Sequence, residues 1–301
     1  ICIALFCTAA TIIRQIIHTY NRAAKYGLPI LGYLAAIATI ITGICIFSGA
    51  DSPSAFVAGH VITGVGFITG CVATAATSST RFSFIPGNSK STGHEVPKGA
   101  FSLGEERTME AVVITISLVA WIWVFVLLAN SHVHPAYFVA GHVMVGLACI
   151  CTSLIALVAS IAKQIRNTYG ESDRKNWPKL VLVMGTVAFI WGLVVILAMA
   201  GNVANTTGFI MMGLGLVCFS ISSKVILLAK VWKQSFALAN RIPLIPVLTA
   251  LLCLFLAAFL FEEGLYDNAF FVPARVLVGL GAICFCLFSI VSILESGTSK
   301  K

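Results

Sequence analysis

The sequence predicts an all-α membrane protein, a polytopic helical bundle with nine transmembrane helices. Composition gives the first indication, because 59% of the 301 residues are hydrophobic and only 10% are charged, whereas soluble domains carry about 25% charged residues. Spacing gives the second, since apolar segments long enough to cross about 30 Å of hydrocarbon recur along the whole chain. The distribution of basic residues, which fall in alternate loops, gives the third.

Nine apolar segments are expected to form the transmembrane helices. Backbone N–H and C=O groups find no water in lipid, so a spanning segment has to be helical. Turn-forming residues such as Pro29 and Pro178 are expected to flank several of the segments. The segments run over residues 1–17, 28–48, 55–78, 110–130, 136–163, 178–200, 206–232, 243–261 and 269–294, all within one integral membrane domain over residues 1–301.

The first segment is short and opens in the middle of an apolar run, without a Met. It lacks the charged start and the cleavage site of a signal peptide. We therefore expect it to be the second half of a helical hairpin, and the intact protein to have ten helices.

The basic residues predict how the bundle is oriented. All but one of the 19 Lys and Arg residues fall on one side, among them Lys224, Lys300 and Lys301, and an excess of such residues marks the cytoplasmic side. The sequence thus predicts a cytoplasmic C-terminus and a flexible cytoplasmic loop, rich in Gly, Pro and Ser, at 81–107. The polar residues of the opposite, outer loops are Asp51, His132, His134, Glu262, Glu263 and Asp267.

Internal matches indicate that the chain is a tandem array of helical hairpins. AFVAGHV recurs as YFVAGHV, FVAGHVMVGLACIC resembles FVPARVLVGLGAIC, and QIIHTY resembles QIRNTY. A fixed offset between similar segments is the signature of a repeat architecture. Each hairpin is expected to pair an outgoing helix with a glycine-marked return helix. The matching pairs are 55–61 with 137–143, 138–151 with 271–284, and 15–20 with 164–169.

Glycines recur on the return helices, as in Gly59-x4-Gly64-x-Gly66 and Gly208-x4-Gly213. Small residues let membrane helices approach closely. We interpret these positions as packing sites, with the lining of a pathway as the alternative.

Four strings carry a resemblance to a known family: TAATIIRQIIHTYNR (8–22), ATSSTRF (76–82), YFVAGHV (137–143) and SLIALVASIAKQIRNTY (153–169). With them the chain resembles the YhiM-type inner-membrane proteins of enteric bacteria over essentially its whole length. The resemblance implies a ten-helix, multi-pass protein of the bacterial inner membrane that is linked to survival at low pH. It implies no established chemistry.

Three ionisable residues occupy equivalent positions in three return helices: His60, His142 and Arg275. Ionisable groups inside a membrane are costly, so they mark candidate functional sites. Histidine changes its charge near pH 6.5, at about the pH of an acidified periplasm. We expect His60 and His142 to be proton-responsive or ligand-binding, the alternative being neutral histidines bonded to a neighbouring helix.

Other interpretations of these residues stay open. Arg275 is expected either to act with the histidines or to reach outward to Glu262, Glu263 or Asp267. Two histidines at equal depth also resemble the ligands of a b-type haem. His132 and His134 form an H-x-H in an outer loop that is expected either to be solvated or to bind a metal weakly.

The remaining features favour no enzyme. The ten cysteines fall inside apolar runs, where thiols behave as small hydrophobic groups, and no catalytic or nucleotide-binding motif is present. We expect no cofactor, no metal and no nucleic acid partner. The expected partners are the lipid bilayer and an unknown small solute or proton. The predicted function is an inner-membrane transporter or channel-like protein supporting survival at low pH, and the alternatives are a haem redox protein or a non-transporting stress or scaffold protein.

Overall fold

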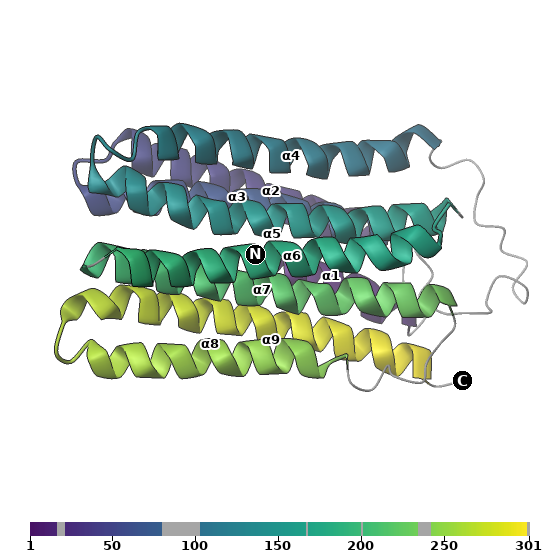
Figure 1. Ribbon diagram of the computed structural model, residues 1–301. Coiled ribbons are helices and arrows are strands. Elements are labelled where there is room, and N and C mark those ends of the chain that lie inside the picture. Colours follow the sequence, from purple (N-terminus) through teal and green to yellow (C-terminus); the bar gives the residue numbers. More distant parts are fainter. Residues whose placement is uncertain (17–21, 80–102, 167, 200, 234–241, 300–301) are drawn as a thin grey trace, which may run out of the picture.

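The computed structural model describes residues 1–16, 22–79, 103–166, 168–199, 201–233 and 242–299. Within these ranges the chain is all-helical, which confirms the predicted fold class (Figure 1). Eight helices are long and apolar enough to span a membrane, and the apolar part of α1, Cys2–Arg14, is shorter. The elements are α1 (Cys2–Ile16), α2 (Arg22–Ser48), α3 (Pro53–Ser79), α4 (Leu103–Ala129), α5 (Pro135–Ile165), α6 (Glu171–Ala198), α7 (Asn202–Lys233), α8 (Leu244–Glu263), η2 (Asn268–Phe270) and α9 (Phe271–Ser299).

The helices form four antiparallel hairpins, α2–α3, α4–α5, α6–α7 and α8–α9, whose members pack closely on each other. The turns inside the hairpins gather at one end of the bundle, on the left in Figure 1, which we call the short-loop end. The helix ends that lead from one hairpin to the next, and the end of α9, lie at the opposite end, which we call the long-loop end.

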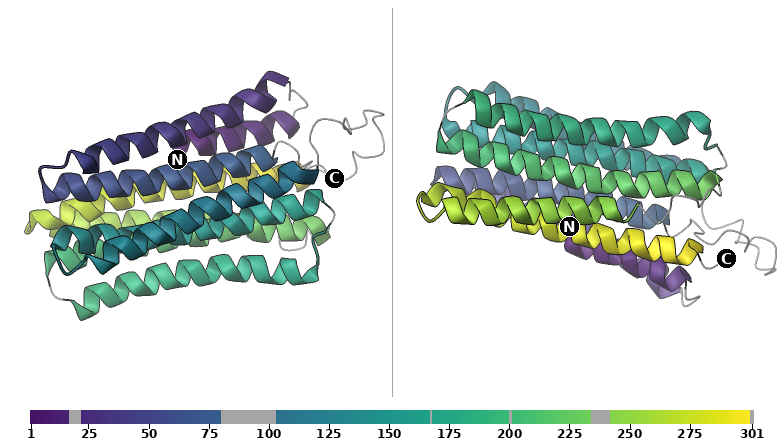
Figure 2. Two further views of the ribbon diagram at one scale, coloured as in Figure 1. Left: turned by 90° about the horizontal axis from the view of Figure 1, so that it is seen from above. Right: turned by 60° about the horizontal axis from the view of Figure 1, so that its bottom comes forward.

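The helices run side by side along one axis (Figure 2), and their contacts place them in two layers around it. The helices α1, α3, α5, α7 and α9 form an inner ring, in which each contacts the next and α9 contacts α1. The helices α2, α4, α6 and α8 lie outside, each against two neighbouring inner helices. Burial agrees with these layers. In the most apolar 18-residue stretch of each helix, 89% of the residues are buried in α5 and in α7, against 17% in α2 and 28% in α4. The predicted return helices therefore lie together at the centre.

Two sets of glycines explain the close packing. One set faces the outgoing helix of the same hairpin, so that a Cβ on Gly208 would lie 2.6 Å from the carbonyl oxygen of Gly192. The other set faces the next inner helix: a Cβ on Gly64, Gly146 or Gly213 would lie 2.5–2.7 Å from the leucine that this helix inserts. Small residues are required where membrane helices approach this closely. The glycines serve packing, as the sequence indicated.

The described ranges correct several expectations. Pro29 and Pro178 do not flank their helices but lie inside α2 and α6, because prolines are tolerated in membrane helices when neighbouring groups satisfy the freed carbonyls. The predicted loop at 81–107 ends in helix, since α4 begins at Leu103. The rest of that loop, 81–102, and Lys300–Lys301 lie outside the described residues.

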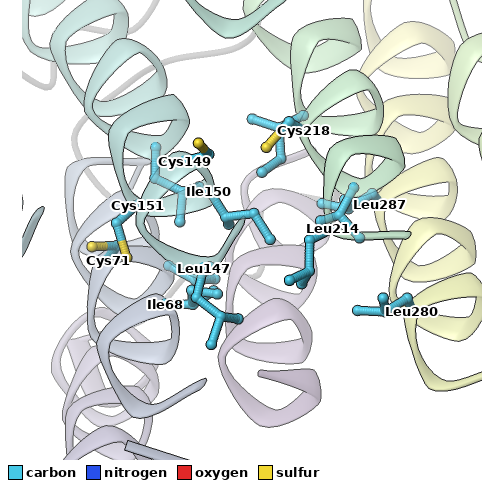
Figure 3. Close-up of a cluster of buried hydrophobic side chains, with 14 of the residues drawn as sticks. Ile68, Cys71, Leu147, Cys149, Ile150, Cys151, Leu214, Cys218, Leu280 and Leu287 are labelled. Atoms are coloured by element: carbon cyan, nitrogen blue, oxygen red, sulfur yellow. The ribbon is translucent and has the colours of Figure 1, made fainter. Parts of the chain in front are cut away.

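The cysteines are free thiols in the described part of the chain, most of them buried. Figure 3 shows Cys151 of α5 pointing toward Cys71 of α3, while Cys149 points away from that pair. Both thiols are buried between the two helices. The cluster thus contributes to the packing of α3 on α5.

Candidate functional site

One face of each inner helix lines a column along the axis of the bundle. On α3 this face is formed by small and medium-sized side chains three or four residues apart, the spacing that keeps side chains on one face of a helix. The face begins near the short-loop end and continues toward the long-loop end. Its residues are Val57, Val61, Val65, Ile68, Val72 and Ala75.

The other inner helices present the same face with the same spacing. We call the whole set, together with the six residues of α3, the axial column. Because the spacing is the same on each helix, the side chains stack as successive aliphatic layers. The further members are Ile1, Leu5 and Thr8 of α1; Val139, Val143, Leu147, Ile150, Leu154 and Leu157 of α5; Thr206, Ile210, Leu214, Val217, Ile221 and Lys224 of α7; and Val272, Val276, Leu280, Ile283 and Leu287 of α9.

Two cavities lie along the axial column. The first, about 500 Å³ in volume, opens at the short-loop end between α3, α5, α7 and α9. The second, about 90 Å³, lies deeper and is lined by all five inner helices. Figure 3 shows Leu147, Leu214, Leu280 and Leu287 in this region. Most of the side chains that line this cavity are aliphatic, and apolar walls disfavour water.

Lys224 is the charged side chain of the axial column among the described residues. From the sequence it was counted among the basic residues of the cytoplasmic side, although it lies within the predicted segment 206–232. It lies on α7, nine residues before Lys233, about 14 Å from the end of the helix at 1.5 Å per residue. Its side chain is only 5% exposed and lines the inner cavity. The repeats contain a signal that was missed, since the offset that pairs Gly59 with Gly208 also pairs Lys224 with Ala75, an apolar position.

His60 lies in an aromatic pocket between the inner and the outer layer. It is 5% exposed, and its ring packs on Phe56 of its own helix, with 4.3 Å between centroids, and on Phe47 of α2, with 4.4 Å. The Trp123 ring of α4 lies edge-on at 6.0 Å. His60 thus contacts both outer helices that flank α3.

His142 repeats this arrangement one hairpin further on. It is 8% exposed, its ring lies 4.1 Å from that of Phe138, and the Trp191 ring of α6 is stacked at 6.2 Å. Pro53 to His60 and Pro135 to His142 are both seven residues, so the two histidines lie at equal depth, about 10 Å from the start of their helices. Neither lines the two axial cavities.

Both rings are held in the same tautomer. Nδ1 of His60 lies 2.8 Å from the carbonyl oxygen of Phe56, and Nδ1 of His142 lies 2.8 Å from that of Phe138. A carbonyl oxygen only accepts hydrogen bonds, so in each neutral ring Nδ1 carries the hydrogen and Nε2 is left as the basic atom. An incoming proton would therefore bind at Nε2, in the aromatic pocket.

Arg275, at the equivalent position of α9, is exposed and packs over the Phe271 ring, 5.9 Å from its centroid. The expected contact with an acidic residue is not formed, because no described salt bridge joins Arg275 to any of them. Asp267 instead caps the short helix η2 and accepts a hydrogen bond of 2.7 Å from Asn202. Glu262 is exposed and Glu263 is half-buried.

The two loop histidines differ in their surroundings. The Nδ1 atom of His134 accepts a hydrogen bond of 3.0 Å from the backbone N–H of Ala136, which caps α5, and His134 also lines the larger cavity. His132 is exposed. In the described ranges no three His, Cys, Asp or Glu side chains are grouped so that they could hold a metal ion.

Ion pairs connect α5 to both of its neighbours, α4 and α6, at the long-loop end. Arg166 of α5 pairs with Glu110 of α4, and Lys163 of α5 pairs with Asp173 of α6 at 2.6 Å. Between α5 and α6, burial raises the pKa of Tyr169 to about 12, so its hydroxyl stays protonated at physiological pH. These contacts stabilise the connections between hairpins and are not candidates for the site.

The fold and the column define the class of protein, a polytopic helical membrane protein with an apolar axial column. The sequence matches the family model described as "Protein of unknown function (DUF2776)" over residues 1–299, and the chain belongs to this family. Over 305 residues it is 46% identical to "Inner membrane protein YhiM" of Escherichia coli (strain K12). The alignment covers 100% of this chain and 86% of the relative. The resemblance inferred from the sequence is confirmed, and with it a multi-pass inner-membrane protein. No solved structure matches the chain.

Proposed function

We propose that this protein is a channel-like transporter of the inner membrane that supports survival at low pH, and that the axial column is its path. The observation that carries the proposal is that equivalent faces of the inner helices line two cavities on one axis. Packing alone does not require a lined cavity, because membrane helices pack without voids through their small residues. The partners of such a path are the lipid bilayer and a small solute or proton.

The described state is a closed one. Layers of Val, Ile and Leu separate the outer cavity from Lys224, and aliphatic constrictions close a pore by excluding water. Conduction therefore requires the inner helices to separate, and the outer helices packed against them are placed to drive that movement.

We propose His60 and His142 as the groups that sense acid. Each ring packs on a phenylalanine of its own inner helix and against an aromatic side chain of an outer helix. Protonation at Nε2 would add a charge to a pocket of aromatic rings, which changes the energy of the contact between the layers. Acid would thereby give these two positions the charge that Arg275 always carries at the equivalent place on α9.

We also propose that the hairpins are tandem copies and that the short-loop end is periplasmic. Equivalent contacts support the first statement: Gly43 meets Gly59 as Gly192 meets Gly208, with both pairs related by one offset. The distribution of basic residues supports the second. With this orientation His60 and His142 lie near the side that external acid reaches first.

The rival functions are supported less well. A haem between His60 and His142 requires one cavity onto which both rings open, whereas each ring packs against its own set of aromatic side chains. A scaffold protein has no need of the axial cavities. The proposal concerns conduction, and it assigns no enzymatic step to any residue.

Flux measurements test the proposal. The full chain is reconstituted in liposomes and the external pH is lowered, while the entry of protons and the release of potassium, chloride and glycerol are followed. We expect release above that of empty liposomes, increasing with acidity. If none of the four probes crosses faster at any pH, and a column wetted by Leu147→Ser with Leu214→Ser also fails to conduct, the axial column is not a path.

A further inference from the structure

Lys224 has an environment that an amine rarely occupies without a partner. It is buried, with 5% of its surface exposed, and lines the inner cavity among Leu157, Ile221 and other apolar side chains. Neither axial cavity is lined by an Asp or a Glu. In the part of the chain that the structure describes, Lys224 also has no salt bridge.

A charged amine in such a place is costly unless an anion approaches it. Charged residues inside membrane helices almost always face the bundle interior or a pathway and are paired with an opposite charge. Because the described lining of the axial column supplies no carboxylate, an anion that enters along the column can supply the opposite charge. The same charge repels cations that enter the cavity, since no negative group offsets it.

We propose that the axial column is a path for small inorganic anions, and that Lys224 binds them at the long-loop end of the inner cavity. The inference rests on the proposed function, because it names the class of solute for the same path. The aliphatic layers act as the gate and Lys224 as the selective site. Thr8 of α1 is the other polar side chain at the cavity wall, and its hydroxyl donates to the carbonyl oxygen of Ala4.

The test needs an open column, because the described state is closed. The substitutions Leu147→Ser and Leu214→Ser place hydroxyls in one aliphatic layer, and chloride is the probe. Vesicles holding the full chain and potassium chloride are transferred to a chloride-free isethionate medium. Valinomycin, a potassium carrier, is then added, and a chloride electrode records the release. In a parallel arm a proton carrier replaces valinomycin, and a potassium electrode records potassium release.

Lys224→Met tests the selective site in this background, since methionine keeps the length of the side chain and removes the amine. We expect chloride release to fall about tenfold, which corresponds to a loss of about 1.4 kcal/mol in the binding of the anion. Lys224→Arg should keep most of the release. Lys230→Met is the matched control, because Lys230 lies on the same helix but does not line the cavity; it should leave the release unchanged.

The outcomes separate the two proposals. Chloride release that depends on the charge at position 224 supports both. Potassium release in place of chloride release, or chloride release that is the same with Lys224→Met, overturns the anion path and leaves a conducting column. No release of either ion from a folded protein overturns the anion path, and it overturns the proposed function itself if protons and glycerol also fail to cross. If the serine pair does not fold, Val65→Thr with Val217→Thr wets two neighbouring layers at almost constant volume, and the same measurements apply.

Discussion

Gly43 on α2 and Gly59 on α3 face each other so closely that a Cβ on either residue would lie less than 3 Å from the carbonyl oxygen of the other. A side chain at Gly59 would also meet the backbone nitrogen of Phe47 at 2.5 Å. Backbone atoms cannot move aside as the end of a flexible side chain can. This contact therefore fixes the distance between the two helices of the first complete hairpin.

We expect Gly59→Ala to destabilise the protein by about 1–3 kcal/mol, the usual cost of overpacking a close contact. The measurement is the thermal unfolding midpoint of the purified protein in detergent. Gly279→Ala is the matched control, because it lies in the helix α9 and a Cβ there would meet nothing within 4 Å. Equal midpoints for the two variants would show that α2 and α3 are not in contact at Gly59.

The pair between Glu110 and Arg166 should contribute to the contact of α4 with α5. Both side chains are largely buried, 20% and 14% exposed. Glu110→Gln removes the charge that compensates Arg166, and we expect a loss of about 1.5–3 kcal/mol, as for a hydrogen bond to a charged group. Arg174→Gln, which breaks an exposed pair with Glu171 within one helix, should cost less than about 1 kcal/mol. Unfolding midpoints that rank the other way would contradict this assignment.

The sequence predicts the spans of this fold well because the bilayer constrains them. A segment in lipid has to be helical and about 20 residues long, so hydropathy located the long helices of the described ranges. The matching glycines predicted which helices pair into hairpins, since Gly59 and Gly208 are related by one offset and make equivalent contacts. The ring of five inner helices did not follow from the sequence, because it depends on which faces of the helices meet.

The candidate site was predicted only in part for the same reason. His60 and His142 were expected at equal depth and are found there, but depth does not tell which way a side chain points, and both turn from the axis toward the outer helices. Lys224 was counted with the loop residues because charge alone places a lysine outside the lipid. The predicted segment 206–232 already included Lys224, but its burial depends on the face of α7 that it occupies and on how the inner helices pack around that face.

The orientation of the bundle is open to a direct measurement. We expect the C-terminus and the connection between α3 and α4 to be cytoplasmic, because nearly all basic residues lie at that end. An alkaline phosphatase fused after Lys301 should be inactive and a green fluorescent protein at the same place should fluoresce. The same reporters fused after Asn130, at the short-loop end, should give the opposite pattern. An active phosphatase after Lys301 would reverse the topology and place the histidines near the cytoplasm.

The histidine pair yields the most specific expectation: replacing both His60 and His142 with Gln should impair survival at low pH while the protein still folds. Gln keeps a hydrogen-bond donor near the carbonyl oxygens of Phe56 and Phe138 but cannot take up a proton. Histidine titrates in the range through which an acidified periplasm passes. The measurement is the surviving fraction of cells after acid exposure, in a strain whose only copy of the protein carries the substitutions.

The structure supplies controls for the double substitution of His60 and His142. His132→Gln changes an exposed loop histidine, so it should leave survival unchanged, and immunoblots of the membrane fraction establish that all variants are present at equal levels. Each single substitution should have a smaller effect than the double one, because the two rings occupy separate aromatic pockets and contact different outer helices. Wild-type survival of the double variant at wild-type protein levels would mean that both histidines only pack the inner layer against the outer one, and the proposed acid sensor would be wrong.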